Sequence, residues 1–416
     1  MRVNLLTKPL LPKLEMFCAT PLMTINDPQS GTVEVMTAFS TIYADHVPTK
    51  IYRAILAEDR PIELDCGHKL GPIKVAYQTF GQRLGVSREN AVLVCHAFTG
   101  DQFPIGENPV TGTSGWWETA VGSGKAIDTD KFHVICSNVL GGCMGTTGPL
   151  EASPSGIPYG LNFPVVTVYD MVKVQERLIR SLGIERLHCV VGGSMGGMQA
   201  LAWDRLYPDR AKRIAVLAAA AKNSAQNIAF NEVGRHAIRT DPNWCDGQYA
   251  SKGVSPVAGL KTARMLAHIG YLSEQSLQQR FGRWLQDHRQ IRYGHDIEYQ
   301  VESYLDHQGD RFIGRFDALS YIYLTRAIDH FDLAASSGGD LTEAFAAGNA
   351  AFFLASFDSD WHFPTNESAL MARALERGGR RVIFREFHSD RGHDSFLLQH
   401  EEFLSALKNF IEDEGP

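Results

Sequence analysis

The stretch from Leu187 to Trp203 constrains the fold of this chain more than any other. Its centre, Gly192–Gly196, reads Gly-Gly-Ser-Met-Gly and matches the pattern G-x-S-x-G. The apolar run before it predicts a strand, and the run rich in Ala, Leu and Met after it predicts a helix. A serine at such a turn adopts a strained backbone that exposes its hydroxyl, and glycines two residues away on either side leave room for the turn. The stretch therefore predicts a nucleophile elbow with Ser194 as the nucleophile.

Strand and helix patterns alternate on both sides of this turn. Short apolar runs at 91–95, 132–139, 187–191 and 214–221 are typical of buried parallel strands. Between them, residues 168–182 carry apolar side chains at helical spacing. This alternation predicts an α/β fold with a doubly wound, mostly parallel sheet.

The pattern changes between residues 222 and 340. Most of this region has helical spacing, its last residues, 336–340, read as a Ser/Gly linker, and strand patterns return after it. We therefore expect one α/β core made of residues 51–221 and 341–416, with a helical lid inserted at 222–340. Such an insertion would cover the carboxyl edge of the sheet, where ligands bind in folds of this kind.

Composition excludes several classes of partner. The 416 residues carry a net charge of −7 and no basic patch, so no nucleic acid partner is expected. No apolar run is long enough to span a membrane. The seven cysteines are scattered and form no C-x-x-C pair, which favours a reducing compartment, and we expect a cytoplasmic protein. Residues 1–50 show no clear period and are predicted to form a leader arm.

A serine nucleophile needs a base, and the base needs an acid that orients it. In this kind of sheet the order along the chain is Ser, then Asp or Glu, then His. Asp358 and Asp360 both follow the predicted strand at 350–357, and we favour Asp360 as the acid. His393 follows a glycine between the last predicted strand and the last predicted helix, and is the predicted base.

The oxyanion that forms during acyl transfer needs two N–H donors. The N–H of Met195 lies at the start of the predicted helix after the nucleophile, where the helix dipole favours negative charge. The loop His96–Gly100 follows the predicted strand at 91–95, and its Phe98 is the second expected donor. For His96 itself we favour a packing or hydrogen-bonding role over a catalytic one.

Several pieces of the sequence occur in a fixed order between about residue 50 and residue 412. They are His96–Gly100, Gly115–Trp117, Asn138–Pro149, Gly192–Gly197, Asn231–Arg235, Ser359–Trp361 and Gly392–Leu397. Together they resemble the homoserine O-acyltransferases of the α/β-hydrolase superfamily, of the methionine-pathway acetyltransferase type. The pieces around Gly141–Pro149 and Gly392–Leu397 are much more specific than the G-x-S-x-G pattern, which the whole superfamily shares.

The resemblance implies an α/β-hydrolase fold with the triad Ser194, Asp360 and His393. It implies transfer of an acetyl group from acetyl-CoA, a co-substrate, to L-homoserine by a ping-pong route, without a metal or a bound cofactor. It further implies that Arg235 binds the carboxylate of the amino acid, that Asp394 binds its amino group, and that two copies form a homodimer through the lid. From the residues alone, a surface salt bridge for Arg235 and a helix N-cap for Asp394 are the alternatives.

Two positions depart from the family pattern. Phe98 stands where the family usually has Leu, and His362 stands where it usually has a branched apolar residue. Both border the expected pocket or the acid loop, so the acyl donor, acetyl or succinyl, stays open. The acceptor, homoserine or serine, stays open too, because the two differ by one methylene group. A lidded esterase or thioesterase is a further alternative. A non-catalytic binding protein is the third, and the intact order of serine, acid and histidine argues against it.

Overall fold

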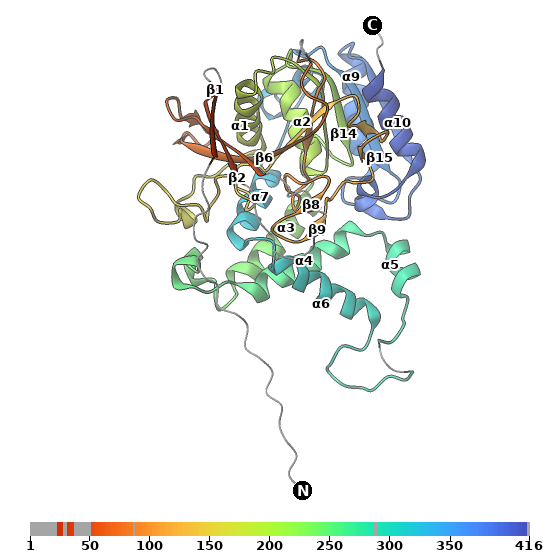
Figure 1. The fold of residues 1–416 in the computed structure, drawn as a ribbon. Coiled ribbons are helices and arrows are strands. Elements are labelled where there is room, and N and C mark those ends of the chain that lie inside the picture. Colours follow the sequence, from red (N-terminus) through yellow and green to blue (C-terminus); the bar gives the residue numbers. More distant parts are fainter. Residues whose placement is uncertain (1–22, 28–30, 37–50, 86–87, 287–288, 414–416) are drawn as a thin grey trace, which may run out of the picture.

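A ten-stranded sheet forms the centre of the computed structural model, which describes residues 23–27, 31–36, 51–85, 88–286 and 289–413 (Figure 1). In spatial order its strands are β1 (Met23–Asp27), β2 (Gly31–Met36), β3 (Ile51–Leu56), β6 (Ile73–Gly81), β12 (His133–Ser137), β7 (Ala91–Cys95), β13 (Leu187–Gly193), β14 (Ala211–Leu217), β15 (Ala351–Phe357) and β16 (Val382–Phe387).

The strands from β12 to β16 in this order pair in parallel. The strands from β1 to β6 extend the sheet at one edge with antiparallel pairs, and β6 joins β12 in the same way. The predicted doubly wound, mostly parallel α/β sheet is thus confirmed. Strand β7 is buried along its whole length. Its Leu93 packs in the core on one face of the sheet, and its neighbours Val92 and Val94 pack in the core on the other face.

Helices cover both faces of this sheet. The helices are α1 (Val168–Ser181), α2 (Met195–Leu206), α3 (Ala225–Arg239), α4 (Val257–Tyr271), α5 (Glu274–Phe281), α6 (Gln300–Ile313), α7 (Ala318–Asp329), α8 (Leu341–Ala344), α9 (Thr365–Arg377) and α10 (Glu401–Glu412). Helices α1, α2 and α9 contribute to the core on the face that carries Leu93, and α10 contributes to the core on the opposite face.

Helix α1 shows why these segments become helices. Thr167 caps it: its side chain accepts a hydrogen bond from the N–H of Asp170, and the Asp170 carboxylate accepts one from the N–H of Thr167. This capping box satisfies backbone donors that the first helical turn leaves without partners. Met171, Val174 and Leu178 then recur at helical spacing and are buried against the sheet.

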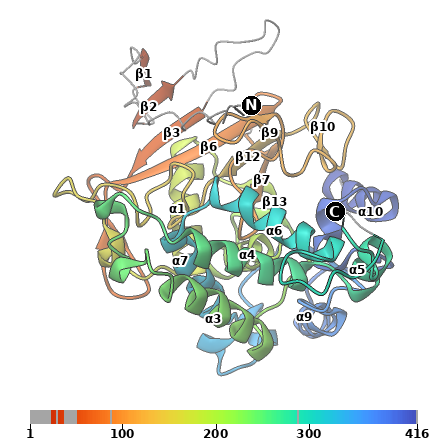
Figure 2. The same ribbon diagram turned by 90° about the horizontal axis from the view of Figure 1, so that it is seen from below.

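Helices α3 to α7 lie between β14 and β15 in the sequence and form a layer on one side of the sheet. Seen from that side, α4 and α6 lie across the strands (Figure 2). We call this layer the helical insertion. It packs closely against the loop that carries His393. At Gly392 there is no room for a side chain, since a Cβ there would lie 2.6 Å from the backbone nitrogen of Ser273 and 2.7 Å from the carbonyl oxygen of Tyr271.

The predicted leader arm, residues 1–50, lies largely outside the described residues. Its described parts are β1 and β2. Strand β1 pairs with β2, and β2 pairs with β3, so both strands extend the sheet. None of the helices in the described ranges is long and apolar enough to cross a membrane.

Candidate active site

Ser194 occupies the turn between β13 and α2 and has the strained backbone angles φ 58° and ψ −125°. The glycines on either side allow this turn. A Cβ on Gly192 would lie 2.4 Å from the backbone of Gly196, and a Cβ on Gly196 would lie 2.1 Å from the carbonyl oxygen of Cys95. Side chains at either position would clash with main chain, so the glycines are a steric requirement of the elbow.

An aspartate–histidine pair lies next to this elbow. The ring nitrogen Nδ1 of His393 is 2.8 Å from Oδ2 of Asp360. Both residues are buried, with 3% of His393 and 2% of Asp360 exposed. The other oxygen of Asp360 accepts hydrogen bonds from the N–H groups of His362 and Phe363, each at 2.9 Å. Asp358, the alternative acid, instead pairs with the exposed His388. The geometry therefore favours Asp360 as the partner of His393.

The pair also sets the protonation of the histidine. Burial alone would lower the pKa of His393, but the charge of Asp360 and the hydrogen bond to it outweigh burial and raise the pKa above the usual value. With Nδ1–H donated to Asp360, the other ring nitrogen, Nε2, is left to accept a proton. This is the arrangement that a general base for Ser194 requires.

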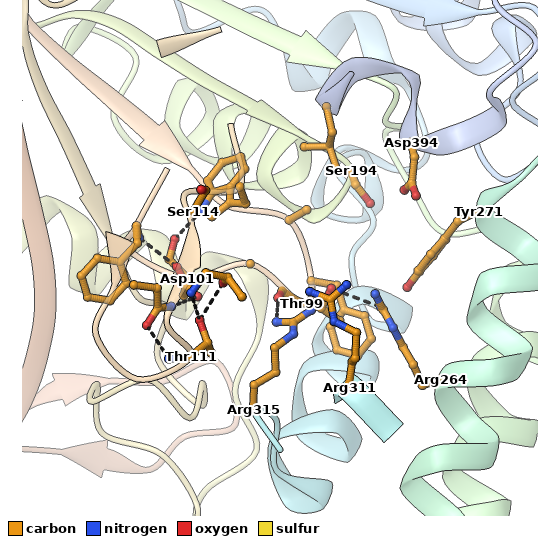
Figure 3. Close-up of a pocket in the computed structure, with 18 of the residues that line it drawn as sticks. Thr99, Asp101, Thr111, Ser114, Ser194, Arg264, Tyr271, Arg311, Arg315 and Asp394 are labelled. Atoms are coloured by element: carbon orange, nitrogen blue, oxygen red, sulfur yellow. Dashed lines mark hydrogen bonds between the residues drawn. The ribbon is translucent and has the colours of Figure 1, made fainter. Parts of the chain in front are cut away.

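Ser194 and His393 both line a cavity of about 320 Å³ (Figure 3). Asp394 lines it too, as predicted for a residue that meets the substrate. Asp394 is half-buried, and the loss of water around its carboxyl group raises its pKa against the opposing charges of His393 and Arg264. Tyr271, at the end of α4, closes the cavity on the side of the helical insertion.

Of the two predicted oxyanion donors, Met195 follows Ser194 directly and Phe98 lines the same cavity as Ser194. Met195 is the first residue of α2, so its N–H has no partner within the helix. Phe98 lines the cavity, and its ring packs edge-on against Phe316 and Tyr321 at centroid distances of 5.8 and 5.1 Å. These contacts fix the loop that would present its N–H.

His96 has the structural role that the sequence favoured. Its Nδ1 lies 2.8 Å from the carbonyl oxygen of Ala97, and its Nε2 accepts a hydrogen bond from the N–H of Val139 at 3.2 Å. Burial lowers the pKa of His96 to about 4, so the ring is neutral near pH 7. The neutral ring ties the loop that carries Phe98 to the segment after β12.

Arg235, which the family resemblance assigns to the carboxylate of the amino acid, lies in α3 of the helical insertion. Its side chain is fully buried and pairs with Asp329 of α7 at 2.7 Å and with Glu232 at 3.0 Å. It is not among the residues that line the cavity with Ser194. That Arg235 binds a substrate carboxylate stays a prediction, and its two ion pairs within the helical insertion favour a structural role.

Sequence reasoning missed the cations that do face the cavity. Arg264 of α4, Arg311 of α6 and Arg315 just after α6 all line it, and Figure 3 shows their guanidinium groups gathered below Ser194. Arg264 lies over the rings of Tyr271 and Phe312, 5.6 and 4.7 Å from their centroids. No motif marks these arginines in the sequence. Only the packing of the helical insertion brings them together.

Both positions that depart from the family pattern border a second, smaller cavity of about 20 Å³ behind the catalytic residues. Phe98 and His362 line it together with Tyr321 and Asn231. The Nδ1 atom of His362 is buried without a hydrogen-bond partner, and burial lowers the pKa of this histidine to about 3. A space of this size holds about one water molecule.

The cavity residues suit charged organic groups. Within the described ranges, no group of three or more His, Cys, Asp or Glu side chains is placed to hold a metal ion. Asp394 and Arg264 instead offer one anion and one cation next to the nucleophile. This pair suits a zwitterionic amino acid, because the carboxylate would meet the guanidinium and the ammonium would meet the carboxyl group.

Comparison with known proteins gives a consistent result. The family model described as alpha/beta hydrolase fold matches residues 90–398. A homoserine O-acetyltransferase from Rhodospirillum rubrum is 55% identical over 358 residues, which cover 86% of this chain and 91% of that protein. The crystal structure of a homoserine O-acetyltransferase from Bacillus anthracis is similar with a TM-score of 0.79 and 27% identity, and covers 88% of this chain and 98% of that one. An acetylester hydrolase from Corynebacterium glutamicum is similar with a TM-score of 0.72 and 25% identity, over 87% of this chain and 95% of that one.

Proposed function

This chain belongs to the homoserine O-acetyltransferase family of the α/β-hydrolase fold, and on that premise we propose that it moves the acetyl group of acetyl-CoA to the hydroxyl of L-homoserine through an acetyl-Ser194 intermediate. The reaction belongs to methionine biosynthesis. One observation carries the assignment of the site: Ser194, His393, Asp394 and Arg264 all line the same cavity. The first two residues suit acyl transfer, and the last two suit the ends of an amino acid.

In the first half-reaction His393 accepts the hydroxyl proton of Ser194 at Nε2, and the serine oxygen attacks the thioester carbonyl carbon. The N–H groups of Phe98 and Met195 stabilise the oxyanion that forms. The carbon–sulfur bond then breaks, His393 returns its proton to the sulfur, and CoA leaves. Asp360 keeps the histidine oriented and stabilises its charged form.

In the second half-reaction the hydroxyl of homoserine takes the place of the thioester. His393 accepts its proton, the homoserine oxygen attacks the acetyl carbon, and the bond to Ser194 breaks with return of the proton to the serine oxygen. Arg264 binds the carboxylate of homoserine and Asp394 binds its ammonium group. Together they hold the hydroxyl against the acyl-enzyme, an advantage of position over bulk water.

Water must be kept from the acyl-enzyme, because the similar acetylester hydrolase shows that this fold also supports hydrolysis. The helical insertion supplies the enclosure. Tyr271 lines the cavity, and the backbone at Gly392 packs directly against the junction of α4 and α5. A lid that touches the loop of the catalytic histidine excludes water at the reacting bond.

Two further statements accompany this function. We propose a cytoplasmic location, which the use of acetyl-CoA supports, together with the free cysteines Cys66, Cys95, Cys136, Cys143, Cys189 and Cys245. We also propose a homodimer formed through the helical insertion. Large apolar side chains exposed on it, Val233 and Trp284 at 54% and 57%, support an interface there.

Initial rates with two donors and two acceptors test the proposed reaction. Acetyl-CoA or succinyl-CoA would be combined with homoserine or serine, and the highest kcat/KM is expected for acetyl-CoA with homoserine. Double-reciprocal plots for that pair should be parallel, because a covalent intermediate separates the two substrates. Release of CoA that does not depend on an acceptor, at a rate equal to the rate with homoserine, would identify a thioesterase instead.

A further inference from the structure

The active-site cavity continues outward into a second hollow of about 440 Å³. We call this hollow the outer groove. It lies between the loop around β9 (Thr113–Ser114) and the end of α6, and its lining includes Val110, Gln308 and Gly314. Thr111, Thr113, Arg264, Arg311 and Arg315 line both spaces, whereas Ser194 lines only the inner one. A ligand that reaches Ser194 from the outer groove must therefore pass the three arginines.

These arginines, of which Arg311 is exposed, differ in their close counter-charges from two arginines with buried side chains elsewhere in the chain. Arg235 and Arg380 are each paired with an aspartate at 2.7 Å. Among the residues that the structure describes, no carboxylate lies within 4 Å of the guanidinium groups of Arg264, Arg311 or Arg315. The charges of Asp101 and Asp394 act on Arg315 and Arg264 without a close ion pair, so three guanidinium groups outnumber the two carboxyl groups of this cavity and favour an anion there.

Arg315 shows that the cluster is costly without a ligand. Its Nη1 donates a 2.8 Å hydrogen bond to the carbonyl oxygen of Thr99, which holds the side chain at the junction of the two spaces. Burial and the charge of Arg264 lower the pKa of Arg315 to about 10. Crowded like charges are stabilised when an anion binds between them.

The end of a helix also favours cations, and Arg311 lies in the last turn of α6. That effect accounts for Arg311 alone. It does not account for Arg264, which comes from α4 and reaches the same place, or for Arg315, which lies beyond the end of α6. Convergence from separate elements indicates a ligand and not a helix cap.

We propose that Arg311 and Arg315, with the outer groove, bind the phosphate groups of the CoA moiety while its pantetheine arm passes inward to Ser194. This inference rests on the proposed function, because it assigns the donor side of the same site. Guanidinium groups bind phosphate oxygens in a two-pronged arrangement, and the CoA moiety carries a diphosphate and a further ribose phosphate. The thioester end reaches the nucleophile, while Arg264 stays available for the carboxylate of the acceptor.

The assignment predicts how the two substrates use one entrance. CoA must leave before homoserine can fill the inner cavity, and phosphates held at Arg311 and Arg315 would obstruct that entrance. Free CoA should therefore inhibit competitively with respect to homoserine, and this inhibition should weaken when the two arginines are neutralised. Salt should weaken acetyl-CoA binding more than homoserine binding, because several phosphate charges are involved.

The test compares a donor with phosphates and a donor without them. The variants are R311Q, R315Q and the double variant. The matched control is R377Q, which removes an exposed arginine from the last turn of another helix, α9. Each is assayed with acetyl-CoA and with S-acetyl-N-acetylcysteamine, a thioester of the same acyl group that lacks the nucleotide. We expect kcat/KM for acetyl-CoA to fall about tenfold or more in the double variant, and that for the short thioester to change less than about twofold.

Equal losses with both donors would overturn the proposal, since the arginines would then act on the chemistry or the fold. Unchanged values with acetyl-CoA would overturn it as well and leave Arg311 as a helix-end cation. If R315Q does not fold, the exposed Arg311 carries the test alone.

Titration of CoA and of pantetheine into the S194A protein gives a readout that needs no activity. In the double arginine variant we expect the affinity for CoA to fall about tenfold or more and the affinity for pantetheine to stay unchanged. A wild type that binds CoA in this way but does not acetylate homoserine would refute the proposed function and leave the phosphate site intact.

Discussion

Exchange of Arg264 and of Arg235, each for alanine, tests which of the two arginines binds the carboxylate of homoserine. Arg264 lines the cavity with Ser194, so R264A should impair the half-reaction that contains homoserine. Arg235 is buried and paired with Asp329, so R235A should impair folding stability instead. The family resemblance implies a substrate role for Arg235, and the comparison therefore separates the two assignments.

The expected loss in R264A follows from its surroundings. The Nε atom of Arg264 is buried without a hydrogen-bond partner, and the guanidinium lies over two aromatic rings, so its charge is partly screened from water. Hydrogen bonds to charged groups contribute about 1.5–3 kcal/mol, which corresponds to roughly 10- to 150-fold in kcat/KM for homoserine. R264K should recover only part of this, because an ammonium group does not reproduce the planar fork.

The expected loss in R235A is one of stability. Removal of the guanidinium takes the ionic partner from Oδ2 of Asp329, whose side chain is 4% exposed, while the amides of Asn223 and Asn231 still donate to Oδ1. Loss of one partner from a buried pair costs about 3–5 kcal/mol, and we expect the lower end because these amides stay.

Pre-steady-state release of CoA and urea unfolding measure the two effects. R264A should keep a full burst of CoA at saturating acetyl-CoA and turn over slowly with homoserine, while its unfolding midpoint stays near that of the wild type. R235A should show the reverse, with a lower midpoint and a near-normal KM for homoserine in the folded fraction. A stable R235A with a raised KM, beside an R264A with normal kinetics, would show that Arg235 and not Arg264 binds the carboxylate.

Two further expectations concern the residues around the base. His393 acts as a base only when neutral, so kcat/KM for acetyl-CoA should rise with pH through a pKa above the usual histidine value and be lost below that pKa. The D360N variant removes the charge that raises this pKa. It should therefore move the rising limb of the pH profile to lower pH and cost several orders of magnitude in kcat. H362L should leave the free energy of unfolding unchanged or raise it by up to about 1 kcal/mol, because it removes a buried nitrogen that has no partner; a loss above about 2 kcal/mol in chemical denaturation would show that this nitrogen holds an ordered water.

The sequence was sufficient to predict the turn at Ser194 and the pairing of Asp360 with His393, because local chemistry specifies them. The turn at Ser194 admits only glycine at two nearby positions, and this leaves a pattern that can be recognised. Asp360 and His393 follow their strands at the same edge of a parallel sheet, so the strand pattern alone indicates that they lie close to the nucleophile. Asp358 could be set aside only with the observed hydrogen bonds.

The substrate-facing arginines could not be found in this way. Arg264 lies in a helix whose sequence has ordinary amphipathic spacing, and its neighbours in space, Arg311 and Arg315, come from a separate part of the helical insertion. Arg235 belonged to a recognisable motif, but its side chain faces Asp329 on α7, far along the chain. The direction of a side chain on a helix depends on which helices pack around it, and local periodicity does not contain that information.

Mass spectrometry of the acylated protein tests the central claim most directly. Wild-type protein would be mixed with acetyl-CoA in the absence of an acceptor, quenched in acid and digested, with S194A treated in parallel. We predict one acetyl group on the peptide that contains Ser194, its loss on addition of homoserine with formation of O-acetylhomoserine, and no such adduct in S194A. An unmodified Ser194 in an enzyme that still acetylates homoserine would contradict the covalent route and with it the role assigned to the elbow.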